Sequence, residues 1–307
     1  MRKNIITGLI LLITYQLVAQ DRVEIFSISA KNAFPTSYDS SLTGKAKETA
    51  GSASLTVPVP ISDDFIIYNN ISYFYYHVDN EPQIPTNIAG PIDVHGFILR
   101  TGIVKRFSAS RSIQVLFSPR YMSDMKGGST SNIQIGGLAL YEKKYSDNLT
   151  IGYGTMVNNE CFGILAIPLV NVNWQISKRV AITGLLPIYG KVKFKLTDKF
   201  NTGMCFLGLT NTFRLNSQNY KDDYIERKCI DLGLYANYNI YKDLFLEGRF
   251  GRTLGREYKQ YKSDDKVDFA TSMIMIGDNR QQKNIMFEDG FYCELRIVYS
   301  IKIPDKK

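Results

Sequence analysis

The chain has 307 residues, of which 44% are hydrophobic, and it contains 20 tyrosines and 17 phenylalanines against one tryptophan. So much apolar material excludes a disordered chain. Beyond residue 20, however, no stretch approaches the roughly 18 uninterrupted apolar residues of a membrane-spanning helix, which excludes a helical membrane bundle. The net charge of +8 at pH 7 favours anionic partners.

The N-terminal segment has the pattern of a secretory signal peptide. Two basic residues precede an apolar stretch over residues 5–13, and the charged sequence begins at Asp21. The apolar stretch is too short to span a bilayer. We therefore expect residues 1–20 to be a signal peptide and residues 21–307 to form one exported domain. Export removes nucleic acid as a partner and leaves outer-membrane lipid, lipopolysaccharide or small solutes.

Short polar turns recur along the exported chain between pairs of apolar residues. They lie at 61–65, 107–113, 145–149, 176–180, 196–200 and 240–244. Ser, Thr and Asp side chains stabilise such turns by bonding the local backbone. The intervals are too irregular for a solenoid. Constant short turns that alternate with loops of variable length are typical of outer-membrane barrels.

The segments between the turns alternate with period two. In 229–240 the even positions are apolar, and the odd positions are mostly small or polar. In 291–303 the odd positions are apolar, and in 191–196 lysines alternate with apolar residues. Because successive side chains of a strand point to opposite faces, each strand has one apolar face.

Three features favour a membrane barrel over a soluble sandwich. The last strand carries seven consecutive apolar odd positions, which suits the roughly 9–11 residues of a tilted membrane strand. Its other face carries charges that a soluble core cannot bury cheaply. Aromatic residues near strand ends predict interfacial girdles: Tyr73 to Tyr76, Phe107, Tyr121, Tyr141, Tyr145, Tyr238, Tyr241, Phe291 and Tyr299.

The sequence therefore predicts an all-β fold, an antiparallel transmembrane up-and-down β-barrel with short periplasmic turns and longer external loops. Weak alternation in 22–32 and 65–77 leaves 12 strands as an alternative to 14, and a short helix is considered near 266–277. The 14 candidate strands are 22–32, 49–60, 65–77, 96–107, 112–122, 131–144, 149–158, 162–176, 180–187, 190–197, 201–215, 228–240, 244–256 and 286–303.

Several of these turns and strands resemble one family. The segments Asn173-Trp174-Gln175-Ile176-Ser177, Leu185-Leu186-Pro187 and Leu196-Thr197-Asp198-Lys199 are similar to those of uncharacterised Gram-negative outer-membrane β-barrels known only as a domain of unknown function. Pro58-Val59-Pro60-Ile61 before a turn is similar as well. The resemblance implies a barrel in the cell outer membrane. It implies no activity, because the family has no assigned catalytic residues.

The two histidines of the chain bracket one loop, as His77-Val78-Asp79 and Asp93-Val94-His95. If the flanking strands pair, these side chains stand opposite each other at the external rim. Imidazole and carboxylate together suit a divalent metal or an Asp/His pair that activates water. The alternative is that these side chains lie at the foot of a polar loop, where the histidines are solvated or hydrogen-bonded and bind nothing. No HExxH, GxSxG or phosphate-binding loop is present.

Parity assigns charged side chains to the lumen: Arg100, Arg120, Lys191, Lys193, Lys195, Asp231, Glu247, Arg249, Glu294 and Arg296. An excess of cations in a wet lumen would favour anions, which predicts a passive pore for small anionic solutes. The alternative is a plugged structural or receptor-like barrel, because 247 and 249 lie beside 294 and 296 and ion pairs across the strands are easy. A second alternative is a rim enzyme that uses His77 and His95. We expect no cofactor.

Two properties remain open from the sequence. The four cysteines, Cys161, Cys205, Cys229 and Cys293, contain no CxxC pair, and their spacing is not that of a disulfide scaffold. Any pairing among them is undetermined. The oligomeric state is undetermined too.

Overall fold

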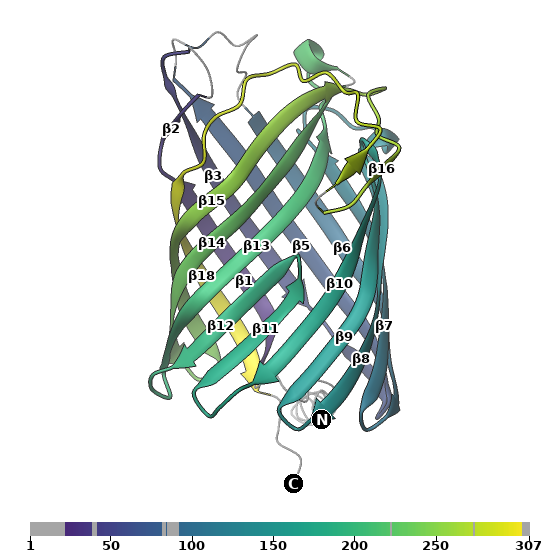
Figure 1. Ribbon diagram of the computed structural model, residues 1–307, viewed down its shortest axis with the longest axis vertical. Coiled ribbons are helices and arrows are strands. Elements are labelled where there is room, and N and C mark those ends of the chain that lie inside the picture. Colours follow the sequence, from purple (N-terminus) through teal and green to yellow (C-terminus); the bar gives the residue numbers. More distant parts are fainter. Residues whose placement is uncertain are drawn as a thin grey trace, which may run out of the picture.

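The computed structural model describes residues 22–38, 42–81, 84, 92–221, 223–272 and 274–302. The expected signal peptide lies outside these residues. Figure 1 shows a tall barrel of tilted strands, with β1 and β18 lying next to each other in the wall. Both described chain ends, Arg22 and Lys302, lie at the same end of the barrel, because Arg22 of β1 pairs with Lys302 of β18.

The wall is a closed antiparallel sheet of 14 strands, which confirms the predicted fold class. Each strand pairs with its neighbours along the chain, and β18 pairs with β1 to close the ring. The wall strands are β1 (Arg22–Ala33), β3 (Lys45–Thr56) continued by β4 (Val59–Ser62), β5 (Phe65–Asn80), β6 (Ile92–Ser108), β7 (Arg111–Ser123), β8 (Ile133–Ser146), β9 (Leu149–Glu160), β10 (Gly163–Gln175), β11 (Val180–Leu186), β12 (Tyr189–Lys195), β13 (Phe200–Arg214), β14 (Asp223–Tyr241), β15 (Leu244–Lys262) and β18 (Phe291–Lys302).

In the described part of the chain, few elements lie outside this ring. They are β2 (Thr36–Ser37), β16 (Phe269–Ala270), β17 (Met275–Ile276) and the 3-10 turns η2 (Thr130–Asn132) and η3 (Gln218–Tyr220). The helix considered near 266–277 is wrong: β16 and β17 pair there as a small antiparallel hairpin. Within the described residues, no helix has the length and apolarity needed to cross a membrane.

The two ends of the barrel differ in the length of their connections. The predicted short turns all lie at the lower end in Figure 1, and the long connection between β15 and β18 lies at the upper end. In the turn after β12, the Thr197 hydroxyl accepts hydrogen bonds from the backbone N–H groups of Lys199 and Phe200. Ser177 does the same for Arg179 and Val180. Side-chain capping thus fixes these tight turns, as the sequence predicted.

The outer face of the wall is an apolar band. Alternate positions of every long strand expose large apolar side chains, such as Ile71 at 56%, Leu234 at 61% and Leu295 at 55%. The adjacent positions face inward and are mostly buried or half-buried. A continuous belt of this kind is stable only against lipid, so the barrel is of the transmembrane type.

The predicted aromatic girdles are partly wrong. Phe107, Tyr145 and Tyr241 are exposed on the outer surface close to the short turns, where an interfacial girdle is expected. Phe74 and Tyr76, in contrast, point inward and pack against Phe213. Their positions alternate with those of the outward residues of β5, so parity within the cluster separates the two groups.

Candidate functional site

The lumen is the candidate site, and the structure places all ten predicted lumen-lining side chains on the inner face of the wall. The strand register carries this assignment, because residues paired across neighbouring strands share a face. Those side chains belong to Arg100, Arg120, Lys191, Lys193, Lys195, Asp231, Glu247, Arg249, Glu294 and Arg296.

In the lower half of the lumen the acidic groups are surrounded by cations. The carboxylate of Glu247 lies 2.5 Å from Lys191, 2.7 Å from Arg249 and 2.8 Å from Arg296. Arg249 also bonds Glu294 at 3.1 Å. The ion pairs across β15 and β18 that the sequence suggested are therefore present. Glu24 bonds Arg296 at 3.2 Å, so these three cations are balanced by three carboxylates, and any excess of positive charge on this inner face comes from Lys193 and Lys195.

This lower half is a solvated chamber. The side chain of Lys191 points inward, yet 26% of it is exposed. An inward side chain of a closed wall reaches solvent only through the lumen. Polar neighbours continue the lining, as Asn171 donates to Glu142 at 2.6 Å and Arg100 donates to Asn70 at 3.0 Å.

Higher in the lumen, charged side chains of β1, β3 and β14 are buried and form a network of ion pairs, which we call the latch. Glu48 of β3 is fully buried and bonds Lys31 at 3.1 Å and Arg227 of β14 at 3.2 Å. The Tyr258 hydroxyl donates to the same carboxylate at 2.7 Å. Lys31 also bonds Asp231 at 2.8 Å. Of these five residues, only Asp231 is among the predicted lumen-lining residues.

Above the latch the barrel is closed by its own strands. β11 and β12 have seven residues each, and Figure 1 shows β11 ending, and the antiparallel β12 beginning, about halfway up the wall. Above this hairpin, β10 and β13 have no wall strand between them. The end of β13 instead crosses to β7, where Arg214 pairs with Ser123 in a parallel bridge.

The contacts of the two faces of β13 show that its end crosses the lumen. Thr212 follows the parity of lipid-facing Met204, yet its hydroxyl donates to Glu160 of β9 at 2.7 Å and its backbone oxygen accepts from Gln134 of β8. Phe213 on the opposite face packs against the inner side of β5, with its ring centroid 6.3 Å from that of Phe74. We call the upper ends of these strands, residues 208–214 of β13, 223–230 of β14 and 254–262 of β15, the septum.

The septum buries an apolar cluster on each face. One cluster lies between the septum and β3, β5, β6 and β7, and it includes Phe213, Ile225 and Tyr258. The other lies between the septum and β10, and it includes Tyr224, Phe162 and Leu165. These clusters contain side chains with no exposed surface, so the upper lumen is packed like a protein core.

The connection between β15 and β18 covers the septum from outside. Its β16 bridges to β10, where Ala270 pairs with Leu165. Arg280 bonds Glu226 of β14 at 2.5 Å and Asp278 at 2.9 Å. The hydrogen bond from Arg280 holds the pKa of the Asp278 carboxyl below its usual range. We call residues 263–290 the lid.

The predicted rim cluster lies on the outer face of β5 and β6, where its side chains form a row of close polar contacts. His77 Nε2 lies 2.9 Å from Asp79, and Asp93 lies 3.3 Å from His95 Nε2 and 3.9 Å from His77 Nδ1. The Nδ1 atom of His95 is 2.9 Å from the Tyr73 hydroxyl. Within the described residues no group of three or more ligating side chains converges on a metal position, so the metal site stays a prediction.

All four cysteines are free thiols. Cys161, Cys205 and Cys229 are buried, whereas Cys293 is exposed on the lipid-facing side of β18.

A closed wall, an apolar outer belt and a charged lumen together define a transmembrane β-barrel protein. Residues 95–299 match a domain of unknown function, DUF6268. The chain belongs to this family, as the sequence resemblance suggested.

Solved structures of low sequence identity are similar to the chain. The COG4313 outer membrane channel from Pseudomonas putida F1 is 11% identical, with a TM-score of 0.48 over 94% of this chain and 98% of that one. A Pseudomonas aeruginosa FadL homologue is also 11% identical, with a TM-score of 0.47 over 93% and 91%. No curated protein matches the sequence.

Proposed function

We propose that the protein is an outer-membrane channel for small solutes, closed in this conformation by the septum. The observation that carries the proposal is the contrast between the two halves of the lumen. The lower half is solvated and lined with charges, whereas the upper half is blocked by the ends of wall strands.

The lumen charges support a preference for anions. Glu247, Glu294 and Glu24 balance Lys191, Arg249 and Arg296 in the chamber. Lys193 and Lys195 lie on the same inner face and add positive charge. A positive constriction attracts anions and repels cations. The solute class that fits is therefore a small anion.

Location and orientation follow from the architecture. Bacterial outer-membrane barrels have an even number of strands, short periplasmic turns and longer external loops. The end with the short turns and the described chain ends would then face the periplasm. The septum and lid would face the cell exterior, so that the chamber opens toward the periplasm.

Anion preference is tested by reversal potentials in planar bilayers under a KCl gradient. Phe213→Ala combined with Arg280→Ala should weaken the septum and supply open channels for this measurement. In that background, changing Lys191, Lys193 and Lys195 to Gln should shift the reversal potential toward cation preference. Lys178→Gln in the turn between β10 and β11 is the matched control outside the lumen. An unchanged reversal potential in the triple variant would refute anion selection by these lysines.

A structural barrel without transport is the second candidate. The observation that favours it is the dry latch, in which Glu48 and Arg227 are buried together with core-like clusters above them. This candidate predicts no conductance steps in wild-type protein or in the septum variant. The channel proposal predicts steps in the septum variant.

A further inference from the structure

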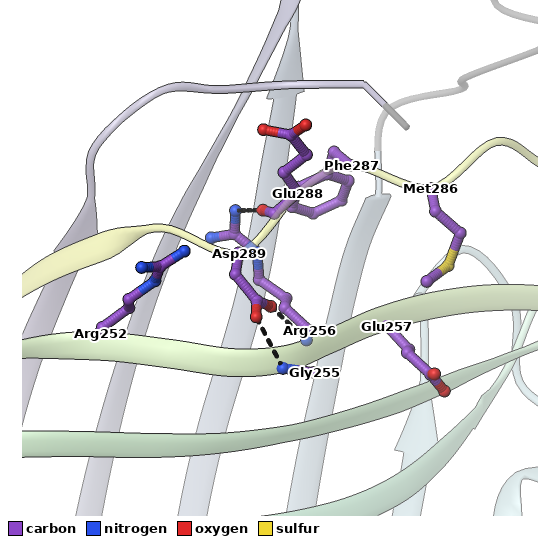
Figure 2. A pocket seen from close by; sticks show the side chains of 8 residues that line it. All are labelled: Arg252, Gly255, Arg256, Glu257, Met286, Phe287, Glu288 and Asp289. Atoms are coloured by element: carbon purple, nitrogen blue, oxygen red, sulfur yellow. Dashed lines mark hydrogen bonds between the residues drawn. The ribbon is translucent and has the colours of Figure 1, made fainter. Parts of the chain in front are cut away.

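A pocket of about 460 Å³ opens beside the upper part of β15. The regular pairing of β15 with β18 ends at Arg252 and Phe291. Beyond this point Gly255 adopts a φ of +58°, a left-handed conformation that glycine tolerates. The strand kinks there, and the segment 286–289 runs past it. The pocket lies between the kink and this segment (Figure 2).

One wall of the pocket contains a buried arginine with unused donors. Arg256 is 3% exposed. Its Nη2 donates to the Thr36 hydroxyl at 2.6 Å and to the backbone oxygen of Glu288, and the guanidinium lies over the Phe287 ring at 4.6 Å. Among the residues that the structure describes, its Nε and Nη1 atoms have no acceptor. Buried donors are nearly always paired, so an acceptor is missing beside this guanidinium.

A second arginine lines the same pocket. Arg252 is exposed, and among the described residues its guanidinium contacts only the Phe291 ring, at 5.7 Å. In Figure 2 the guanidinium groups of Arg252 and Arg256 point toward one another. Two facing cations without a carboxylate between them favour a bound anion, because Arg presents a planar fork of donors to phosphate or carboxylate oxygens.

The acidic residues of the pocket are otherwise engaged. Asp289 accepts from the backbone N–H groups of Gly255 and Arg256 at 3.0 Å and 2.8 Å. Glu257 pairs with Lys259 at 3.0 Å. The carboxylate of Glu288 points away from both arginines in Figure 2. The site between the arginines is therefore not filled by a side chain of the pocket.

The height of the pocket indicates the kind of anion. Directly below it, Phe250 and Phe291 expose half of their surfaces and stack on the outer face, with ring centroids 5.8 Å apart. Above it lies the exposed Glu288. The pocket therefore lies at the boundary between the apolar belt and water, which is the level of lipid headgroups.

We propose that Arg252 and Arg256 bind the phosphate group of a lipid headgroup in the leaflet at the lid end of the barrel. This site is independent of solute transport and rests only on the membrane orientation inferred above. Free inorganic phosphate offers the same oxygens, but only a lipid also contacts Phe250 and Phe291 below the pocket.

The test is native mass spectrometry of the full exported chain in detergent, titrated with bisphosphorylated lipid A, with its dephosphorylated form and with inorganic phosphate. Wild-type protein should bind the phosphorylated lipid, and Arg252→Ala should weaken that binding about tenfold, the loss typical of one charge-assisted contact. Arg256→Gln should weaken it as well. Arg179→Ala, an exposed arginine at the opposite end of the barrel, is the control and should leave binding unchanged.

Arg252 is exposed at the pocket edge, so its variant tests the site even if Arg256→Gln fails to fold. Folding of each variant is checked by its migration on unheated gels. Equal binding of the phosphorylated and dephosphorylated lipids, or full binding by Arg252→Ala, would overturn the proposal. Binding of inorganic phosphate without the lipid would overturn the assignment to a headgroup.

Discussion

Glu48 is a carboxylate that the barrel buries completely, and three partners compensate it. Lys31 and Arg227 supply positive charge, and Tyr258 supplies a hydroxyl hydrogen. Arg227 also donates from Nε to the Tyr258 hydroxyl at 2.7 Å. A buried ion pair of this kind adds little stability over an apolar packing, but the loss of one partner leaves a charge that neither water nor protein solvates.

Arg227→Met should therefore destabilise the barrel by about 3–5 kcal/mol. The measurement is urea unfolding in detergent micelles, followed by the fluorescence of the single tryptophan, Trp174. The double variant Glu48→Gln with Arg227→Met removes both charges and should recover much of the loss. Equal destabilisation by the single and double variants would show that the charges are not coupled.

Sequence parity identified part of this chemistry. Glu247 and Arg249 alternate with lipid-facing residues in a clearly periodic strand, so their inward direction was predictable. Glu48 lies outside the predicted strand 49–60, because β3 begins at Lys45 in a sequence that is mostly small and polar and shows little alternation. Arg227 was missed because β14 begins at Asp223 rather than at the predicted residue 228.

At the scale of elements, the wall depends on strict alternation between a lipid face and a lumen face. Leu234 of β14 lies in the middle of the belt and is 61% exposed. Its neighbour Tyr235 points inward and is buried. The alternation was predictable from the sequence because it repeats along each wall strand.

Leu234→Arg should destabilise the barrel by about 2–4 kcal/mol, because a charge near the bilayer midplane has no water. The measurement is reversible unfolding in lipid vesicles. Asn201→Arg, on the inner face of β13 near the open end of the chamber, is the matched control and should cost much less. A similar cost for both variants would contradict the assignment of faces.

The septum was not predictable from alternation. The segment 201–215 was interpreted as a wall strand, and its first residues are wall. Its last residues keep the same period while both faces become buried, because β11 and β12 stop early and let β13 cross the lumen. The crossing of β13 depends on contacts between residues far apart in the chain, such as Thr212 with Glu160. The local periodicity of the sequence does not reveal such contacts.

The lid should loosen when its clamp is removed. Arg280→Ala takes away the bonds to Glu226 and Asp278, so trypsin should cleave after Lys266 and Lys283, the lid sites that remain in this variant, several-fold faster than in wild-type protein. Mass spectrometry of the fragments locates the cuts. Lys178→Ala at the opposite end is the control. Unchanged cleavage after Arg280→Ala would mean that the ion pairs do not hold the lid.

At the scale of the whole molecule, the apolar belt requires a membrane or detergent. The exported chain should stay in the membrane fraction after salt and alkaline washing and should leave it only with detergent. The fold, its number of strands and the position of the short turns at one end of the barrel were predictable from the spacing of the turns and the period of the strands. The closure of the lumen was not, because it arises from strands of unequal length.

Closure of the lumen by the septum is the central feature of the proposed channel, and single-channel recording in planar bilayers tests it most directly. Wild-type protein should be silent or show only rare, brief openings. The variant Phe213→Ala with Arg280→Ala, which removes one packing anchor and the lid clamp, should show sustained conductance steps. Sustained steps in wild-type protein at the same level as in the variant would contradict the account.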